Sequence, residues 1–87
     1  MDKVKRLIKA GASIPGAIRE ALGMTVEEFS AKYDRPPTHV SAVINGKRAP
    51  VEADIDAFVA AQGGTPDEWR ELLWLAGRPA NASSTAA

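Results

Sequence analysis

The sequence predicts an all-α fold, a compact bundle of five to six short helices in one domain. Apolar residues recur at spacings of three and four along most of the 87-residue chain, and residues that cap or end helices separate these segments. No segment has the alternating pattern of a β-strand. Hydrophobic residues make up 45% of the chain and charged residues 25%, as in an ordinary globular domain.

Two helices are expected at the start of the chain. The first covers residues 2–10, where the apolar residues share one side at helical spacing. The second begins at Ser13 or Ile14, tolerates Pro15 in its first turn and ends at Gly23. The chain therefore divides into an added N-terminal helix over residues 1–12, a domain over 13–78 and a disordered tail over 79–87.

Two capping boxes mark two further helix starts. In each, a threonine hydroxyl accepts a hydrogen bond from a first-turn N–H, and a glutamate three residues later reaches back to the threonine N–H. The boxes are Thr25–Glu28, before a third helix, and Thr65–Glu68, before a sixth helix with Pro66 at its first position. The apolar residues are Phe29, Ala31 and Tyr33 in the third helix, and Trp69, Leu72, Leu73 and Ala76 in the sixth.

Two consecutive prolines separate the third helix from a fourth. Pro36 pushes the preceding residue out of helical geometry, and Pro37 can occupy the first helical position, where its missing N–H costs least. The fourth helix then runs from Pro37 to Ile44, with Val40, Val43 and Ile44 on its inner side. A fifth helix is expected from Val51 to Gln62, with Val51, Ile55, Phe58 and Val59 pointing inward.

Charge is distributed unevenly along the chain, although the net charge is zero. Residues 1–50 carry nine cations against five anions, a net charge of +4, and residues 51–87 carry two against six, a net charge of −4. This asymmetry favours one face for an anionic partner and another that faces away, although scatter over two solvated surfaces gives the same sum.

Two short helices joined by a tight turn, with basic residues after the second, form the pattern of a helix-turn-helix. Residues 22–50 resemble the lambda-repressor/Cro-like (XRE-like) family of helix-turn-helix DNA-binding domains. The resemblance is carried, in order, by Gly23-Met24-Thr25, Glu27-Glu28-Phe29, the small residue Ala31, the Val40/Val43/Ile44 spacing and Asn45-Gly46-Lys47-Arg48-x-Pro50. It extends over about residues 14–75.

The resemblance implies a sequence-specific regulator of transcription, repressor-like, whose fourth helix enters the major groove of double-stranded DNA. The base contacts carried over by position are Pro37, Thr38, Ser41 and Ala42, with His39 on the flank. The phosphate contacts are Thr25, Arg35, Asn45, the Gly46 N–H, Lys47 and Arg48. The chain departs from the family at Val26 (commonly Gln), Asp34 (commonly Gly) and Pro36 (commonly Ser or Thr).

Trp74 and Leu75 lie off the apolar stripe of the sixth helix, which indicates either a protein interface or a deeper core with the N-terminal helix packed on that side. We expect a homodimer through Trp69, Leu73 and Trp74, since such domains usually bind two half-sites about one helical turn apart. The alternative is a helical protein–protein interaction module, or an antitoxin-like partner-binding protein, that uses the same helix. By family analogy, the protein would be a phage, prophage or plasmid regulator.

Other classes of function find little support in the sequence. The chain has one histidine and no cysteine, so we expect no enzyme, no metal site and no cofactor. No apolar run reaches the roughly 20 residues of a membrane span, and we expect a cytoplasmic protein without a membrane partner.

Overall fold

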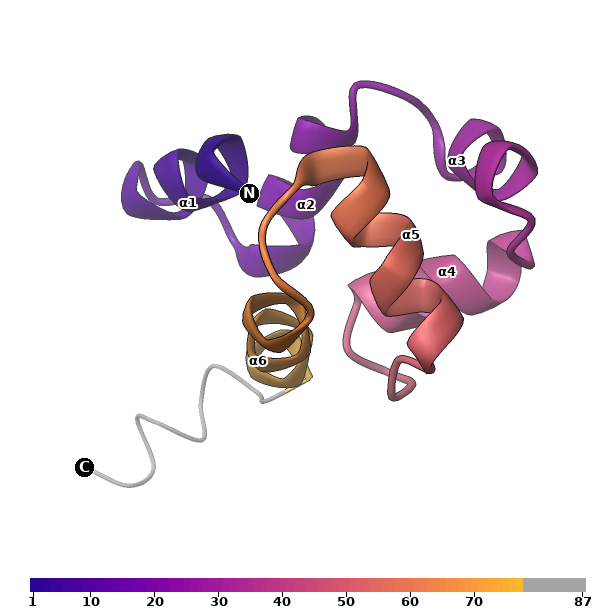
Figure 1. Cartoon of the computed structure of the whole chain (residues 1–87). Coiled ribbons are helices and arrows are strands. Elements are labelled where there is room, and N and C mark those ends of the chain that lie inside the picture. The colour runs from indigo at the N-terminus through magenta and orange to yellow at the C-terminus, as the bar shows by residue number, and fades with distance from the viewer. Residues whose placement is uncertain (78–87) are drawn as a thin grey trace.

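A computed structural model describes residues 1–77, which form six helices connected by short loops (Figure 1). The predicted all-α bundle is confirmed, and each helix begins and ends within a residue or so of the expected position. The expected tail over residues 79–87 lies outside the described residues. The helices are α1 (Asp2–Lys9), α2 (Ile14–Leu22), α3 (Val26–Tyr33), α4 (Pro37–Ile44), α5 (Glu52–Gln62) and α6 (Pro66–Ala76).

The helix starts follow from the local chemistry that the sequence indicated. Both capping boxes are formed: the Thr25 hydroxyl accepts from the Glu28 N–H at 3.1 Å, and the Thr65 hydroxyl accepts from the Glu68 N–H at 3.2 Å. Ser13 caps α2 in the same way. These bonds satisfy N–H groups that have no partner within the helix, so they fix where each helix begins.

A column of aromatic rings connects α3, α5 and α6 through the core. The rings of Phe29 and Phe58 stack with their centroids 5.2 Å apart, and those of Phe58 and Trp69 with theirs 4.9 Å apart. All three side chains are buried. Stacked pairs of this kind add roughly 0.5–1.5 kcal/mol each beyond the burial of their surface. The inner face of α4 closes the core from one side with Val40, Val43 and Ile44, as expected.

Two apolar residues of the expected helices, Val51 and Ala31, are exposed. Val51 is 48% exposed, because it precedes α5 as its N-cap and does not belong to the apolar face of that helix. Ala31 is exposed and its neighbour Ser30 is buried. Residues two apart lie on nearly opposite sides of a helix, so the burial of Phe29 on α3 directs Ala31 outward.

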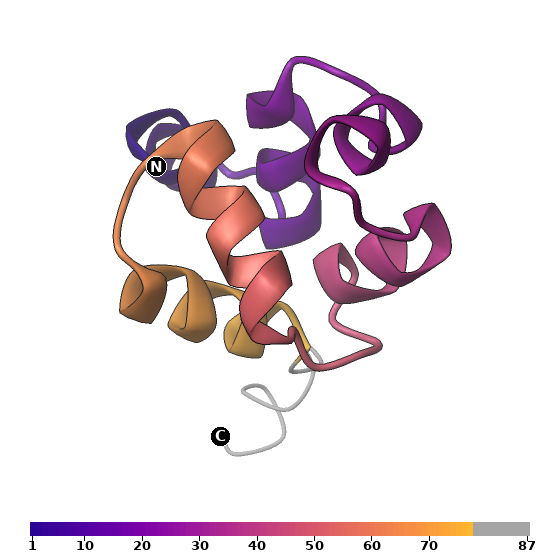
Figure 2. The ribbon, with the colours of Figure 1, turned by 45° about the vertical axis from the view of Figure 1, so that its right-hand side comes forward.

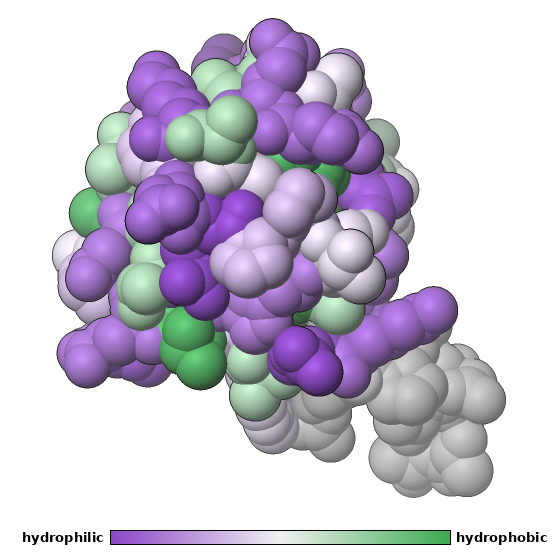
Figure 3. Space-filling model, turned by 90° about the vertical axis from the view of Figure 1, so that its right-hand side faces the viewer, coloured by the Kyte–Doolittle hydropathy of each residue, from purple (hydrophilic) through white to green (hydrophobic). Residues whose placement is uncertain are grey.

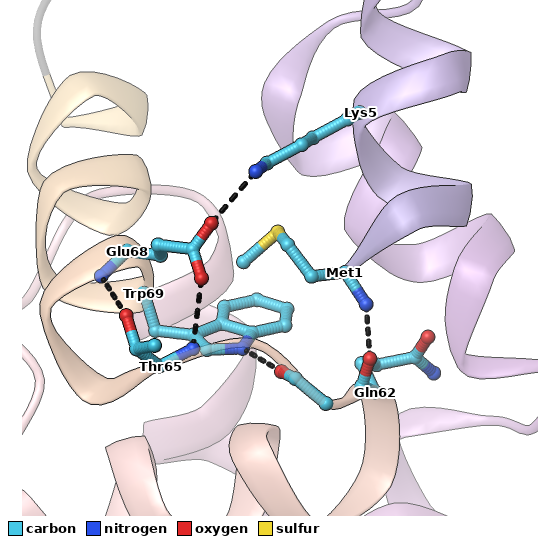
Figure 4. A network of polar contacts seen from close by, with 7 residues as sticks. Met1, Lys5, Gln62, Thr65, Glu68 and Trp69 are labelled. Carbon is cyan, nitrogen blue, oxygen red and sulfur yellow. Dashed lines mark hydrogen bonds and ion pairs between the residues drawn. The ribbon is translucent and has the colours of Figure 1, made fainter.

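Helix α1 packs mainly on α2 and covers one side of the core. Val4 is fully buried, and so is most of Met1, whose amino group donates to the carbonyl oxygen of Gln62 (Figure 4). Lys5 and Glu68 form an ion pair at 2.6 Å that joins α1 to α6. Figures 1 and 2 place α1 at the opposite end of the molecule from α3 and α4.

No helix among residues 1–77 combines the length and the apolar composition that crossing a membrane requires.

The end of α4 is packed directly against the end of α6. Gly46 has a φ of 75°, and a Cβ atom there would lie 2.3 Å from the Gly77 Cα and 2.4 Å from the carbonyl oxygen of Ala76. Only glycine fits this contact, because a side chain would collide with backbone that cannot move aside. The contact therefore fixes the C-terminal end of α4 on the bundle.

We predict that Gly46→Ala destabilises the protein by about 2–4 kcal/mol, because it adds a backbone clash to the cost of a left-handed conformation. Gly23→Ala is the matched control: its φ is 65°, and nothing lies within 4 Å of the added Cβ. The control should cost only about 1 kcal/mol. Urea unfolding of the two variants checks this, and equal losses of stability would contradict the proposed contact.

Candidate nucleic-acid interface

Helices α3 and α4 pack together at one end of the molecule and are joined by the turn at residues 34–36. Asp34 ends α3 in the left-handed conformation with a φ of 54°, and its N–H donates to the carbonyl oxygen of Ser30. Aspartate adopts this left-handed conformation more readily than most residues, so it can occupy a turn position where the family that the chain resembles commonly has glycine. Pro36 is extended and Pro37 begins α4, as the proline pair predicted.

The outer side of α4 is a strip of short side chains, which we call the α4 strip and define as Thr38, Ala42 and Asn45. At 3.6 residues per turn these positions lie opposite the buried face of the helix. Thr38 is exposed, as is Pro37 before it, whereas Ala42 and Asn45 are partly buried. The freely accessible part of α4 is therefore its first turn.

Two arginines contact the flanks of the α4 strip. The Arg19 Nη2 atom donates to the Ser41 hydroxyl oxygen at 3.3 Å, and the Arg48 Nη1 atom lies 3.3 Å from the Nδ1 atom of His39. Ser41 and His39 are roughly 160° apart about the helix axis, so the arginines lie on opposite sides of the strip. Arg19 was not among the expected site residues, because its approach from α2 depends on how the helices pack.

A buried carboxylate lies beneath this surface. Asp54 on α5 is 1% exposed and accepts hydrogen bonds from Arg35 Nε at 2.8 Å, His39 Nε2 at 2.6 Å and the Val51 N–H at 2.9 Å. The donors come from the α3–α4 turn, from α4 and from the start of α5. One side chain thus connects three segments that border the α4 strip.

The surroundings of Asp54 keep it ionised. Burial raises the pKa of its carboxyl, but hydrogen bonds from the Val51 N–H, His39 and Arg35 lower it more, so the pKa lies below its ordinary value. Arg35 and His39, expected to contact phosphate and base respectively, are thereby directed toward α5. Their side chains are only 19% and 12% exposed.

The loop after α4 presents two exposed cations, Lys47 and Arg48. The expected role of the Gly46 N–H needs correction, because this group already donates to the carbonyl oxygen of Val43 at 3.0 Å. The Asn45 N–H likewise donates to Ser41. Thr25 uses its hydroxyl oxygen to accept a capping bond, which leaves its O–H as a donor at the start of α3.

The end of the molecule that carries α3 and α4 is mainly hydrophilic. Figure 3 shows polar and charged residues over most of this face, with apolar residues scattered between them. The cations Arg19, Lys32, Lys47 and Arg48 are exposed in the part of the chain around α2–α4, together with the anions Glu20, Glu27, Glu28 and Asp34. The interface is thus polar and of mixed charge, with arginines at the flanks of the strip.

Two of the three residues expected at a dimer interface are in the core of a single chain. Trp69 is fully buried and donates from its indole Nε1 to the carbonyl oxygen of Gly63 at 2.7 Å, and Leu73 is 2% exposed. Trp74 is 59% exposed and Leu75 40%. A groove of about 380 Å³ lies beside Trp74, between α6 and the loop after α4, and Val51, Ile55, Arg48 and Arg70 contribute to its lining.

Comparison of the chain with protein-family models, with curated proteins and with solved structures finds no match.

Asp54 was absent from the expected site, although one local signal pointed to it. An acidic residue three positions after a helix N-cap is a recurrent capping arrangement, and Asp54 holds this position relative to Val51. Its bonds to Arg35 and His39 span 19 and 15 residues of sequence, and no local pattern encodes them.

We predict that Asp54→Asn destabilises the protein by about 3 kcal/mol at neutral pH, because it leaves the partly buried Arg35 without its counter-charge. Asp56→Asn, an exposed position on the same helix, should change stability by less than about 0.5 kcal/mol. Chemical denaturation of both variants measures the difference.

Acid provides a second check on Asp54. A depressed carboxyl pKa stabilises the folded state above the pKa of the unfolded chain, and this contribution is lost as the pH falls through the folded-state pKa. The stability difference between the wild type and Asp54→Asn should therefore shrink below about pH 4. A difference that stayed constant down to pH 2 would contradict an ionised Asp54.

Proposed function

We propose that the protein is a repressor-like transcriptional regulator that binds double-stranded DNA non-covalently through α4 in the major groove. The observation that supports this best is the α4 strip with an arginine on each flank. A helix of this width fits the major groove, and cations on both sides of it lie where the phosphates on the two groove edges approach. The resemblance of residues 22–50 to lambda-repressor/Cro-like domains agrees with this orientation.

Base contacts under this proposal come from short side chains. The hydroxyls of Thr38 and Ser41 can donate to or accept from base edges, and Ala42 or the Thr38 methyl can pack on a thymine methyl. Pro37 adds an apolar contact at the helix start. Because none of these side chains forms a bidentate pair with a base, we infer that sequence preference depends strongly on DNA shape and deformability.

Phosphate contacts supply most of the affinity under this proposal. Arg19, Lys47 and Arg48 are exposed cations around α4, and the Thr25 hydroxyl adds a neutral donor. Three neutralised phosphates give a slope of about −3 for the logarithm of affinity against the logarithm of salt concentration, or about a fiftyfold loss between 50 and 200 mM salt per chain.

We predict that Lys47→Ala/Arg48→Ala weakens binding to a labelled duplex pool and makes the salt slope shallower by about 2. Lys3→Ala/Arg6→Ala is the matched control, because it removes the same charge from α1 at the opposite end of the molecule. The control should retain the slope of the wild type. Titrations at several salt concentrations, monitored by fluorescence anisotropy, measure all three proteins.

Two outcomes would count against this function. A folded wild type that does not bind duplex DNA at low salt would refute it. If both double variants made the salt dependence of the affinity shallower by the same amount, binding would follow net charge and would not use the surface around α4.

We further propose that the functional unit is a dimer formed through the exposed side chains of Trp74 and Leu75 on α6. Two exposed apolar side chains at neighbouring positions of one helix are typical of a protein interface, and Trp74 also borders the groove. A two-fold arrangement would present two copies of α4 to half-sites about one helical turn apart. The alternative is that a different protein binds this surface, and the exposed side chains of Trp74 and Leu75 support it equally well.

We predict that sedimentation at micromolar concentration detects a dimer. Trp74→Ala should weaken the association at least tenfold, about 1.4 kcal/mol, as is usual for a central aromatic residue of an interface. Glu27→Ala, an exposed change on α3, should not alter it. A strict monomer, both free and on DNA, would refute the dimer and favour a different protein partner.

A further inference from the structure

The Ser41 hydroxyl on the flank of the α4 strip has one hydrogen-bond partner within residues 1–77, the guanidinium of Arg19. The Arg19 Nη2 atom donates to the Ser41 oxygen at 3.3 Å, and a guanidinium can donate hydrogen bonds but cannot accept them. The Ser41 oxygen is therefore the acceptor in this contact, and its O–H proton remains available for another partner. A serine hydroxyl can otherwise donate or accept, so this contact gives it a defined polarity.

The same arginine disfavours a second acceptor role for Ser41. One lone pair of the hydroxyl oxygen already faces the guanidinium, and a further N–H donor would have to approach beside that positive charge. Donation through the O–H has the opposite effect, because the guanidinium polarises the hydroxyl and strengthens its hydrogen bond to an acceptor. The Thr38 hydroxyl has no such partner within the described part of the chain, so the fold leaves its polarity open.

Arg19 keeps most of its donors for another partner. Its side chain is exposed on α2, and within residues 1–77 its one hydrogen bond is the contact with Ser41. That contact uses a single guanidinium N–H, and the other N–H groups remain for a phosphate. Arg19 and Ser41 therefore present donors only, from the edge of α4 toward its outer side.

We propose that Arg19 is a positioning residue for base recognition, and that the Ser41 hydroxyl it orients donates to the N7 atom of a purine. This inference rests on the proposed DNA-binding function and specifies what the surface of α4 reads. In the major groove, both purines present N7 as an acceptor, whereas cytosine presents its amino group, which is a donor. N7 is also the purine acceptor that lies nearest its own backbone, on the side where Arg19 would bind a phosphate.

Base analogues test the polarity of Ser41 directly. A duplex selected by the wild type from a random library is synthesised again with each purine in turn replaced by its 7-deaza analogue. This analogue has a C–H group in place of N7 and retains Watson–Crick pairing. At one position we expect the wild type to bind about three- to tenfold more weakly, as for the loss of one hydrogen bond. In Ser41→Ala the same replacement should have no effect, because the hydroxyl that donates to N7 is absent.

Two substitutions of Arg19 test its positioning role. Arg19→Met keeps an unbranched side chain but removes the donor, so the loss caused by the 7-deaza base should fall below about twofold. Arg19→Lys supplies another group that can only donate, and it should retain most of that loss. Lys47→Ala is the matched control: it removes one cation from the loop after α4, so overall affinity falls while the full effect of the 7-deaza base remains.

Each comparison is a ratio between the affinities of one protein for two duplexes. A partial loss of folding in a variant lowers both affinities equally and leaves this ratio unchanged. An effect of the 7-deaza base on the ratio that depends on Arg19 and Ser41, but not on Lys47, therefore reports recognition of the base and not a change in stability or total charge.

Different results would overturn different parts of the inference. If no purine position shows a 7-deaza effect that disappears in Ser41→Ala, Ser41 does not donate to N7. If the effect is the same in Arg19→Met as in the wild type, Arg19 does not orient the hydroxyl. A folded wild type that selects no duplex at low salt would refute the DNA-binding function itself, and that result precedes any experiment with base analogues.

Discussion

The arrangement of the candidate interface depends on one buried carboxylate. Asp54 lies on α5, and its two oxygens accept from the turn before α4, from α4 itself and from the backbone that begins α5. An ionised side chain that is 1% exposed is tolerated only when such partners compensate for the lost hydration. The same requirement therefore fixes the positions of Arg35 and His39, and with them the turn and one flank of α4.

The two ends of α4 are held by different kinds of contact. At its start, Pro36 and Pro37 restrict the backbone, and Arg35 is bonded to α5; at its end, Gly46 lies against the backbone of Gly77. The outer strip between these ends makes few contacts of its own. Because both ends of α4 are fixed in this way, binding of the helix to a groove, as proposed, would require little ordering of its backbone.

Local features of the fold were predictable, because their causes are local. Capping boxes, prolines and glycines act within one turn of the chain, and apolar spacing defined the buried face of α4. Two predictions are wrong because apolar spacing alone does not show what a residue packs against: Val51 only caps α5, and Trp69 and Leu73 fill the core of a single chain. The roles of Asp54, Arg19 and Gly46 depend on contacts between distant segments, which spacing along the sequence does not reveal.

Ion pairs between the two halves of the chain change how its uneven distribution of charge is interpreted. Glu68 and Asp54, from the acidic half, bind Lys5 and Arg35 from the basic half, so the excess of positive charge in residues 1–50 is partly neutralised within the fold. Around α4 the exposed cations are Arg19, Lys32, Lys47 and Arg48, and under the proposed function each phosphate that they neutralise adds to the salt-dependent part of the affinity. If the protein binds DNA as proposed, two copies acting together would double the phosphate contacts and so raise the affinity without longer side chains on α4.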